Sequence, residues 1–444
     1  MNQAFLEYYR CPEHFADFRS TDGYSGQPCS GYFRLGPDLI CYGKTIVEGQ
    51  PRVNSSLLDI YEHVRIDGST CVLPFNPTEV ANNLRYERYV DEIRKPGWKK
   101  LIRNAYYCIR PTLPVSVRRR LQRTWLRGWD KKAFPEWPLD RTVDRMFERL
   151  MSFCVTMHQG VDVPFIWFWP EGMSSCAIMT HDVETVSGLE FAGELMDIND
   201  SFGIKSSFQI IPEDRYSATE STLAAIRSRG FEINVHDLKH DGHLFDNRQQ
   251  FLESAAQINQ HARRLGAKGF RSGVLYRNLD WYGAFSFSYD MSVPNVGHLD
   301  PQPGGCCTVM PYFVGKLLEL PLTTTQDYSL FNILGSYSLD LWREQIARIM
   351  EQHGLVSFIV HPDYLNTQKA RDSYCSLLSH LASLRSNEGL WVTLPGQVDT
   401  WWRQRSRMKL VPDAGEWRIE GPGAERARVA YATLAENKVI CRIS

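Results

Sequence analysis

The sequence has no run of about 18 apolar residues, so we expect no membrane-spanning helix. Its N-terminus, MNQAFLEYYRCPEHF, has no basic start followed by an apolar stretch, which argues against a secretory signal peptide. The eleven cysteines are scattered and form no CxxC pair, a pattern typical of free thiols in a reducing compartment and not of disulfide frameworks or zinc–thiolate sites. We therefore predict a cytoplasmic protein.

The chain also has almost no net charge. Its 50 Lys and Arg residues are balanced by 51 Asp and Glu residues, so no overall field would attract nucleic acid, and we predict no nucleic-acid partner. The sequence contains no internal repeat and no low-complexity tract. With 444 residues, of which 43% are hydrophobic, it can form one large domain with appendages, or two or three domains.

Residues 172–403 show a regular alternation of short apolar segments and amphipathic segments. The apolar segments of strand length are 176–180, 206–211, 231–235, 268–273, 291–295, 317–323, 355–360 and 390–394. The segments of helical length are 188–203, 221–230, 248–266, 280–289, 340–354 and 368–386. Repeated β–α units imply a parallel sheet, and about eight strands in one run favour a barrel. The predicted fold class is therefore α/β.

Two shorter parts flank this region. Residues 1–165 form an N-terminal extension, in which 31–43 has the pattern of a hairpin and 140–155 the pattern of a helix. Residues 405–444 predict a short C-terminal β tail of two or three strands. We therefore expect an α+β extension over 1–165, a barrel over 172–403 and a β tail over 405–444.

Segment 94–132 of the extension is strongly basic and rich in aromatic residues. Its only acid is Asp130, and it contains three tryptophans and two tyrosines. Such a segment could lie as an interfacial helix on an anionic membrane surface, or bind a phosphate-linked glycan carrier. The alternative is a solvated basic face that packs on an acidic part of the same chain. The first interpretation adds a peripheral membrane location to the predicted cytoplasmic one.

Polar side chains of the central region stand where its strands end. Segment 180–184, Thr-His-Asp-Val-Glu, ends the first strand, and His236 and His240 follow the third. Arg271 lies on the fourth strand, and His361 ends a later one. In a parallel barrel these strand ends face one rim, so residues nearly 180 positions apart in the sequence would share one pocket.

His236 and His240 are four residues apart. On a helical turn this spacing puts both imidazole rings on one face, where they could bind one metal ion. Two imidazoles and a carboxylate, with an open fourth position, make up a catalytic zinc site. A pair of this spacing also arises by chance, with each histidine as a hydrogen-bonded loop residue. Its position after a strand, together with the acidic residues of 180–184, favours the metal site.

In their order and spacing these motifs resemble those of polysaccharide deacetylases, the NodB-type carbohydrate esterases. The family's first motif, Thr-Phe-Asp-Asp-Gly, corresponds to segment 180–184, and its His-Ser/Thr-x-x-His motif corresponds to 236–240. Its Arg-x-Pro-Tyr motif corresponds to 271–274, and its late strand ending in His corresponds to LVSFIVHPDYL, which contains His361. The resemblance covers about residues 172–403. It implies an irregular parallel (β/α) barrel of seven to eight strands.

The resemblance further implies a metal-dependent hydrolase that removes N-acetyl groups from a carbohydrate in the biosynthesis of an envelope polysaccharide. A divalent metal, with Zn²⁺ as the expected ion, would be held by Glu184, His236 and His240. Val183 takes the place of the family's second Asp, a metal ligand, so the third ligand is Glu184 or Asp182. The expected partner is an N-acetylated sugar or glycan.

The catalytic groups follow from the same resemblance. Asp182 would accept the proton of the attacking water as general base, and Arg271 would orient Asp182 and keep it ionised. His361 would donate a proton to the leaving sugar amine. The resemblance therefore implies Asp182, Arg271 and His361 as catalytic residues.

Two other functions stay open from the sequence. The Val183 replacement would suit a glycan-binding barrel without turnover, and the same metal site could hydrolyse a non-glycan, non-peptide C–N bond. Asp363 either sets the tautomer of His361 or caps a turn. Four further residues are weaker candidates for ligand or pocket positions: His181, His243, Asp290 and Asp327.

Overall fold

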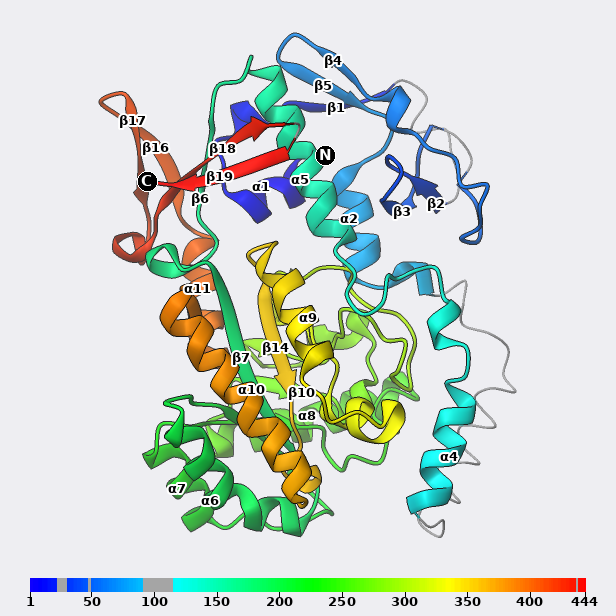
Figure 1. Cartoon of the computed structure of the whole chain (residues 1–444), viewed down its shortest axis with the longest axis vertical. Helices are drawn as coiled ribbons and strands as arrows, with labels where there is room; N and C mark the ends of the chain where they lie inside the picture. Colours follow the sequence, from blue (N-terminus) through cyan, green and yellow to red (C-terminus); the bar gives the residue numbers. More distant parts are fainter. Residues whose placement is uncertain (22–29, 47–48, 91–114, 437) are drawn as a thin grey trace.

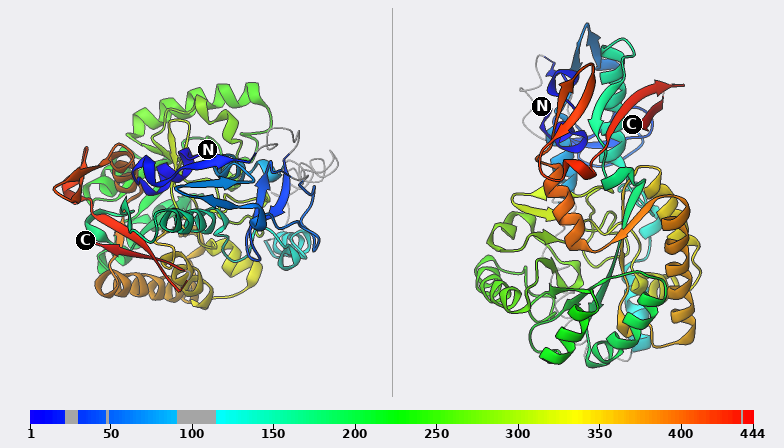
Figure 2. Two further views of the ribbon diagram at one scale, coloured as in Figure 1. Left: turned by 90° about the horizontal axis from the view of Figure 1, so that it is seen from above. Right: turned by 90° about the vertical axis from the view of Figure 1, so that its left-hand side faces the viewer.

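The computed structural model of the chain describes residues 1–21, 30–46, 49–90, 115–436 and 438–444. These residues form an elongated molecule, with the barrel at one end (Figure 1). The N-terminal extension and the C-terminal tail lie together at the other end, as the side view in Figure 2 also shows.

The barrel is built from one nine-stranded sheet. Its strands along the chain are β7 Ser175–Val183, β8 Ser207–Ile210, β9 Glu232–His236, β10 Gly269–Arg271, β11 Tyr289–Asp290, β12 Tyr312–Val314, β13 Leu317–Glu319, β14 Leu355–Ile359 and β15 Leu390–Thr393. Their spatial order is β12-β13-β11-β10-β9-β8-β7-β14, and β15 also pairs with β7. Within the described residues the pairings of this sheet are parallel, except that of β12 with β13. This topology confirms the predicted α/β barrel.

The sheet closes irregularly between β13 and β14. The hydroxyl of Thr323 donates to the carbonyl oxygen of Leu355 at 2.7 Å, and the hydroxyl of Thr324 donates to that of Ser357 at 2.7 Å. Hydrogen bonds from threonine side chains thus replace much of the backbone hydrogen bonding that joins neighbouring strands elsewhere in the sheet. The barrel has the irregularity that the resemblance implies.

Helices cover the outside of the barrel, as Figure 1 shows for α9 and α10. They are α6 Val186–Ser201, α7 Glu220–Ser228, α8 Arg248–Leu265, α9 Asp340–Met350, α10 Gln368–Asn387 and α11 Pro395–Arg405. The side chains of Asn247 and Thr367 cap α8 and α10 by accepting backbone N–H groups of the first turn. α8 ends at Gly266 with φ +60°, a left-handed conformation that glycine adopts without strain.

The helix predicted at 280–289 and the strand predicted at 291–295 are both wrong in their bounds. Residues Leu279–Ala284 form a short 3-10 helix, η9, and β11 precedes the predicted strand. The ring of Phe285 packs 4.5 Å from that of Phe270 on the neighbouring strand, between centroids. This packing holds the chain extended where the amphipathic pattern alone predicts a helix.

The other end of the molecule combines the extension with the tail. Its helices are α1 Gln3–Tyr9, α2 Pro77–Arg85 and α5 Thr142–Met157, and its strands are β1 Phe18–Ser20, β2 Gly31–Arg34, β3 Ile40–Gly43, β4 Arg65–Asp67, β5 Thr70–Leu73, β6 Val163–Ile166, β16 Lys409–Asp413, β17 Glu416–Glu420, β18 Val429–Ala435 and β19 Lys438–Ile443. β2 and β3 form the predicted hairpin, and α5 is the predicted helix. β18 pairs with β19 and with β6, so the C-terminal tail shares one sheet with the strand that precedes the barrel.

One hydrophobic core connects the two ends of the molecule. Phe5 of α1, Phe147 of α5 and Trp401 of α11 are at most 1% exposed and belong to the same buried cluster, which continues to Cys176 at the start of β7. The start of the barrel strands is therefore packed against the extension. The opposite end of the strands, where the predicted site residues stand, faces away from it.

Residues 91–114, and with them much of the basic segment 94–132, lie outside the described residues. The described part contains α4, Val115–Trp125, which runs alongside the barrel in Figure 1. Arg123 attaches α4 to the barrel by donating from two nitrogens to the carbonyl oxygen of Asn332, at 2.8 and 3.1 Å. No helix among the described residues has both the length and the apolar character needed to cross a bilayer.

Candidate metal centre

The ends of four parallel strands bring the predicted site residues to one rim of the barrel. Asp182 and Glu184 stand at the end of β7, and His236 ends β9. Arg271 ends β10, and His361 directly follows β14. Because parallel strands end on the same side of a barrel, these distant segments converge as the sequence predicts.

Glu184, His236 and His240, called the metal group below, could hold a metal ion, since their ligand atoms lie within 4.8 Å of one another. His240 Nε2 lies 3.0 Å from Glu184 Oε1, and the two imidazole rings are 4.8 Å apart between centroids. Nε2 of both histidines is buried and, among the described residues, lacks an aligned hydrogen-bond partner. Two buried imidazole nitrogens that converge on one carboxylate match the donors of a divalent metal site.

The second ring nitrogen of His236 fixes the tautomer. Nδ1 lies 3.1 Å from the carbonyl oxygen of Arg271, to which it donates when the ring is neutral. This tautomer leaves the lone pair on Nε2, the atom directed to the metal group. Burial lowers the pKa of His236 to about 4, so the ring is neutral at neutral pH and able to bind a metal.

The loop between the two histidines is not the helical turn that their spacing predicts. Asp237 and His240 both have left-handed backbone conformations, with φ of +59° and +55°. The Asp237 carboxylate accepts hydrogen bonds from the N–H groups of Leu238 at 2.7 Å and Gly273 at 3.2 Å. A Cβ on Gly273 would lie 2.2 Å from Asp237 Oδ2, so only glycine allows the two loops to approach this closely. The rings of His236 and His240 therefore converge through a bend that Asp237 supports.

Asp182 is held by Arg271 inside the barrel. Nη1 of Arg271 lies 3.3 Å from both carboxylate oxygens, and Nη2 donates to the hydroxyl of Thr180 at 3.1 Å. Burial raises the pKa of Asp182, but the charge of Arg271 and the nearby imidazoles lower it more, so the pKa lies below its ordinary value. Asp182 Oδ2 is 3.8 Å from His236 Nε2. An ionised carboxylate thus stands next to the metal group.

His361 faces the metal group from another strand end. Its Nε2 lies 3.6 Å from Glu184 Oε1. Its Nδ1 lies 2.7 Å from Asp327 Oδ1, and its backbone N–H donates to Asp327 Oδ2 at 2.8 Å. Burial lowers the pKa of His361, but Asp327 and Glu184 raise it more, to about 10. The ring therefore carries a proton at neutral pH.

Asp327, and not Asp363, is the residue that fixes the His361 ring. Asp363 accepts from the backbone N–H of Glu184 at 3.1 Å and from the hydroxyl of Thr185, so it caps the turn after β7. This decides between the two roles that the sequence leaves open for Asp363. No local pattern marks Asp327 as the partner, because it precedes His361 by 34 positions and lies on a separate loop.

Two of the other sequence candidates, His181 and His243, lie away from the metal group. Val183, which replaces the family's second Asp, is fully buried in the core between sheet and helices. His181 is fully buried as well, and its Nε2 lies 3.2 Å from the side-chain amide of Asn199, so it does not line the site. His243 is exposed and pairs with Asp246 at 2.8 Å, as a loop histidine.

Asp290 belongs to a buried carboxyl pair. Asp290 and Glu319 are both 0% exposed, and Asp290 accepts from the hydroxyl of Ser292 at 2.7 Å and from its N–H at 3.0 Å. Burial raises the pKa of both carboxyl groups, and the charge of Asp290 raises that of Glu319 further. Asp290 therefore does not meet sugar hydroxyls.

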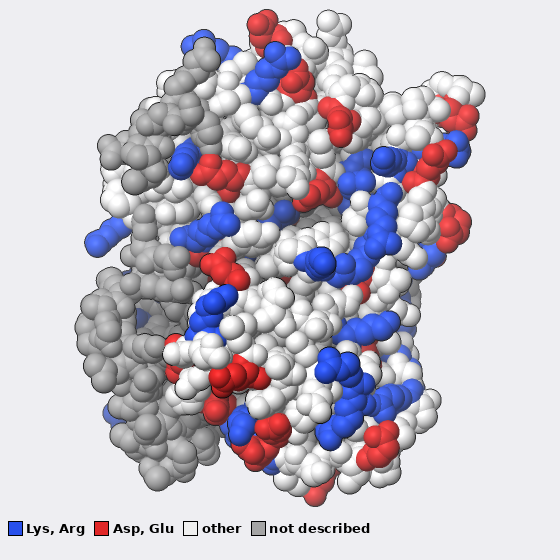
Figure 3. All heavy atoms as spheres, turned by 180° about the vertical axis from the view of Figure 1, so that it is seen from behind, with Lys and Arg blue, Asp and Glu red and all other residues white. Residues whose placement is uncertain are grey.

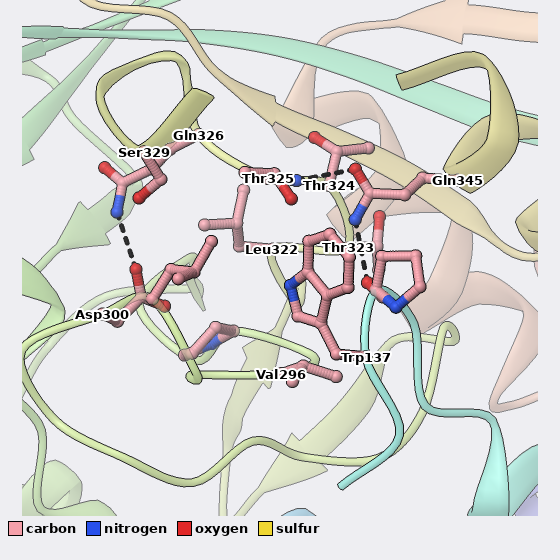
Figure 4. A pocket seen from close by; sticks show the side chains of 13 residues that line it. Trp137, Val296, Asp300, Leu322, Thr323, Thr324, Thr325, Gln326, Ser329 and Gln345 are labelled. Atoms are coloured by element: carbon pink, nitrogen blue, oxygen red, sulfur yellow. Dashed lines mark hydrogen bonds between the residues drawn. The ribbon is translucent and has the colours of Figure 1, made fainter. Parts of the chain in front are cut away.

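A small cavity lies beside this rim (Figure 4). Its lining includes Leu322 and Gln326, and the side-chain amide of Gln326 donates to Asp300 at 2.7 Å. Gln326 directly precedes Asp327, so the cavity adjoins the support of His361. Its volume of about 20 Å³ has room for one water molecule and not for a sugar.

Comparisons with known proteins find similarity in solved structures. No family model matches the sequence, and no curated protein matches it. A Mycobacterium smegmatis protein assigned to the polysaccharide deacetylases is similar at 18% identity, over 54% of this chain and 93% of that one, with a TM-score of 0.42. PuuE allantoinase is similar at 12% identity, over 53% and 92% of the two chains, with a TM-score of 0.40. Peptidoglycan deacetylase PdaC from Bacillus subtilis is similar at 11% identity, over 53% and 95%, with a TM-score of 0.34.

The deacetylases among these structures belong to the family that the motifs resemble. At such identities and TM-scores the similarity concerns the fold alone. What the site does is therefore inferred from its own residues.

Proposed function

We propose that the chain is a metal-dependent hydrolase that removes the acetyl group from an N-acetylated sugar or glycan. One observation carries the proposal: the metal group lies between an ionised carboxylate, Asp182, and a protonated imidazole, His361. Asp182 is 3.8 Å from His236 on one side, and His361 is 3.6 Å from Glu184 on the other. Amide hydrolysis needs a base for the attacking water and an acid for the leaving amine, and this arrangement supplies both.

The residues present fit a divalent ion, and we propose zinc. Glu184, His236 and His240 supply two imidazole nitrogens and one carboxylate oxygen, and three protein ligands leave positions for water and substrate. Bound there, the ion would supply Lewis acidity, which lowers the pKa of water and polarises an amide carbonyl. Val183 is not needed as a ligand, because Glu184 takes that place one residue later.

Asp182 would take the proton of the attacking water. Arg271 contacts both of its oxygens at 3.3 Å, and Thr180 holds Arg271 in turn, so the carboxylate keeps one orientation. The positive charge of Arg271 keeps Asp182 ionised and ready to accept a proton at neutral pH.

His361 would give the proton of its Nε2 to the nitrogen of the leaving amine. Asp327 holds the other ring nitrogen, so the proton that faces the site is the one on Nε2. An amine nitrogen leaves readily only when it is protonated, which makes this acid necessary. The product acetate and the free amine would then dissociate.

The proposal is tested by acetate release from N-acetylglucosamine oligomers. Chelation of the metal should abolish the release, and added zinc should restore it. His236→Ala should lower the rate by about 10³-fold or more, because it removes a metal ligand. His243→Ala is the matched control, since His243 is an exposed histidine seven residues later that lies outside the metal group. Activity that survives both chelation and His236→Ala would rule out the metal mechanism.

Elemental analysis separates the other functions. A stoichiometric metal without acetate release would favour hydrolysis of a non-glycan C–N bond, and allantoin is a suitable probe because an allantoinase is among the similar structures. A protein that binds glycan without any bound metal would be a binding protein without turnover.

We further propose that α4 attaches the protein peripherally to an anionic membrane surface in the cytoplasm, where the substrate would be an envelope-polysaccharide precursor. Val117, Leu121 and Trp125 lie four residues apart and are 40%, 44% and 52% exposed, and Arg120 beside them is exposed. Apolar residues flanked by basic ones are typical of interfacial helices. Sedimentation with liposomes tests the idea: Leu121→Asp should reduce binding to anionic vesicles, and equally negligible binding of the wild type to anionic and neutral vesicles would end it.

A further inference from the structure

A cavity of about 410 Å³ lies between the N-terminal extension and the barrel. Its walls come from α1, α2, β12 and the end of α11. The end of α11 contacts the chain just before β7 begins, whereas the metal group stands where β7 ends. The cavity is therefore at the opposite end of the barrel from the metal group. Figure 3 shows a hollow at the junction of the two parts, with Lys and Arg side chains at its border.

Arg85, the last residue of α2, is buried in the wall of this cavity. It is 6% exposed, and its guanidinium carbon lies 5.4 Å from the ring centroids of both Phe147 and Tyr312. Its Nε is buried without a hydrogen-bond partner, and within the described part of the chain its guanidinium forms no hydrogen bond and no ion pair. Burying a guanidinium with unused donors is unfavourable unless something else accepts from them.

The carboxylate of Asp144 does not accept hydrogen bonds from the Arg85 guanidinium. It accepts from the hydroxyl of Thr308 at 2.7 Å, from the N–H of Val309 at 2.9 Å and from the hydroxyl of Tyr8 at 3.3 Å. Burial raises the pKa of Asp144 to about 6, and the charge of Arg85 offsets only part of that rise. Asp144 is thus committed to other donors, and Arg85 has donors available to a ligand.

Two more arginines line the cavity. Arg405 is 1% exposed and donates to backbone carbonyl oxygens, including that of Tyr8 at 2.9 Å. Arg10 donates to the carbonyl oxygen of Met408 at 2.7 Å, and its Nε is buried without a partner among the described residues. Burial, and next the charge of Arg10, lowers the pKa of Arg405 to about 9. Three arginines against one acid, Glu7, give the lining a net charge of +2.

We propose that this cavity binds a small organic anion whose carboxylate or phosphate group contacts Arg85. Both groups match the planar donor fork of arginine. The volume suits a ligand about the size of a monosaccharide. The rings of Tyr86, Tyr312 and Trp402 in the lining provide an apolar wall, against which a sugar ring can pack. The ligand class is therefore a sugar phosphate or a sugar acid, and the site does not depend on the activity proposed for the barrel rim.

Thermal unfolding and calorimetric titration of the full chain test the proposal. The probes are inorganic phosphate, glucose 1-phosphate and glucuronate, each compared with sodium chloride at equal ionic strength. A saturable rise in Tm is expected with at least one probe, because a ligand that binds only the folded state stabilises it. A response to glucose 1-phosphate alone identifies a sugar phosphate, and one to glucuronate alone identifies a sugar acid.

Arg85→Met keeps the apolar contacts of the side chain and removes its donors. We expect the Kd of the bound probe to rise by roughly tenfold or more, the effect of losing a charged hydrogen bond. Arg407→Gln is the matched control, because Arg407 is an exposed arginine close to Arg405 that does not line the cavity. Arg10→Gln is a second variant, at a less buried position, and should weaken binding as well.

Two results would overturn the proposal. The first is the lack of any saturable response of the wild type to the three probes. The second is an unchanged Kd in Arg85→Met, which would show that the anion does not contact Arg85. If Arg85→Met does not fold, the titration of Arg10→Gln against Arg407→Gln decides the question.

Discussion

Two buried arginines, at opposite ends of the barrel, show two uses of a buried charge. Arg271 is 0% exposed, and the chain supplies its partners, the carboxylate of Asp182 and the hydroxyl of Thr180. Arg85 is 6% exposed and packs between aromatic rings, without an acceptor in the described residues. Arg271 thus holds the side chain of Asp182 in place, whereas the hydrogen-bond donors of Arg85 are available to a ligand in the cavity. A buried cation that lacks its own anion indicates a ligand site.

The sharpest test of this comparison replaces each arginine with methionine. Arg271→Met leaves Asp182 buried and unpaired, which should lower the free energy of unfolding by about 3–5 kcal/mol. It should also lower acetate release by about 10²-fold or more, because the base loses its orientation. Arg85→Met should change the free energy of unfolding by less than about 1 kcal/mol, or raise it, because the charge that it removes has no partner.

Urea unfolding in a buffer without phosphate or carboxylate measures both values. An equal loss of stability in the two variants would contradict the contrast between the two arginines, because Arg85 would then have a partner within the protein. Wild-type activity in Arg271→Met would contradict it as well, since Asp182 would then be held by something else.

A second test contrasts two aspartates near the same end of the barrel. Asp327→Asn removes the charge that raises the pKa of His361, so the ring should lose its proton at lower pH. We expect the alkaline limb of kcat/KM to move to lower pH and the maximal rate to fall by about 10²-fold. Asp363→Asn is the matched control: Asp363 caps the turn after β7 and does not contact the His361 ring, so the alkaline limb should keep its position.

A pH profile of acetate release for the two variants and the wild type gives the answer. An unchanged alkaline limb in Asp327→Asn would mean that His361 is not the acid that this limb reports. An equal shift in Asp363→Asn would point to a general disturbance of the rim.

The sequence was sufficient for the barrel and for the convergence of its strand ends. β7 and β14 are buried along their whole length, and such strands appear as continuous apolar runs, with polar residues where they end. The four-residue spacing also predicted correctly that the rings of His236 and His240 are neighbours. The helical turn that was expected to bring them together is not there. The rings meet through a bend with left-handed residues, and that bend depends on Gly273 from another loop.

The features that the sequence could not predict depend on contacts between distant segments. Asp327 becomes the support of His361 only because two loops meet, and Asp363 is much closer in sequence. Arg85 ends an amphipathic helix and would be expected at its surface, but Phe147 and Tyr312 enclose it. Neither relationship leaves a periodic pattern or a motif in the chain.

The last test concerns Asp144, which lies near Arg85 but is bonded elsewhere. Burial raises its pKa to about 6, above the value of about 3.9 in an unfolded chain. The folded state therefore binds this proton more tightly, so the contribution of Asp144 to stability is complete below pH 4 and is lost as the pH rises from 4 to 6. Asp144→Asn removes this dependence, so between pH 4.5 and 7 the difference in the free energy of unfolding between wild type and variant should change by about 2 kcal/mol. Urea unfolding of both proteins across this range measures it, and curves that stay parallel would mean that an anion, or Arg85 itself, already holds Asp144 in its charged form.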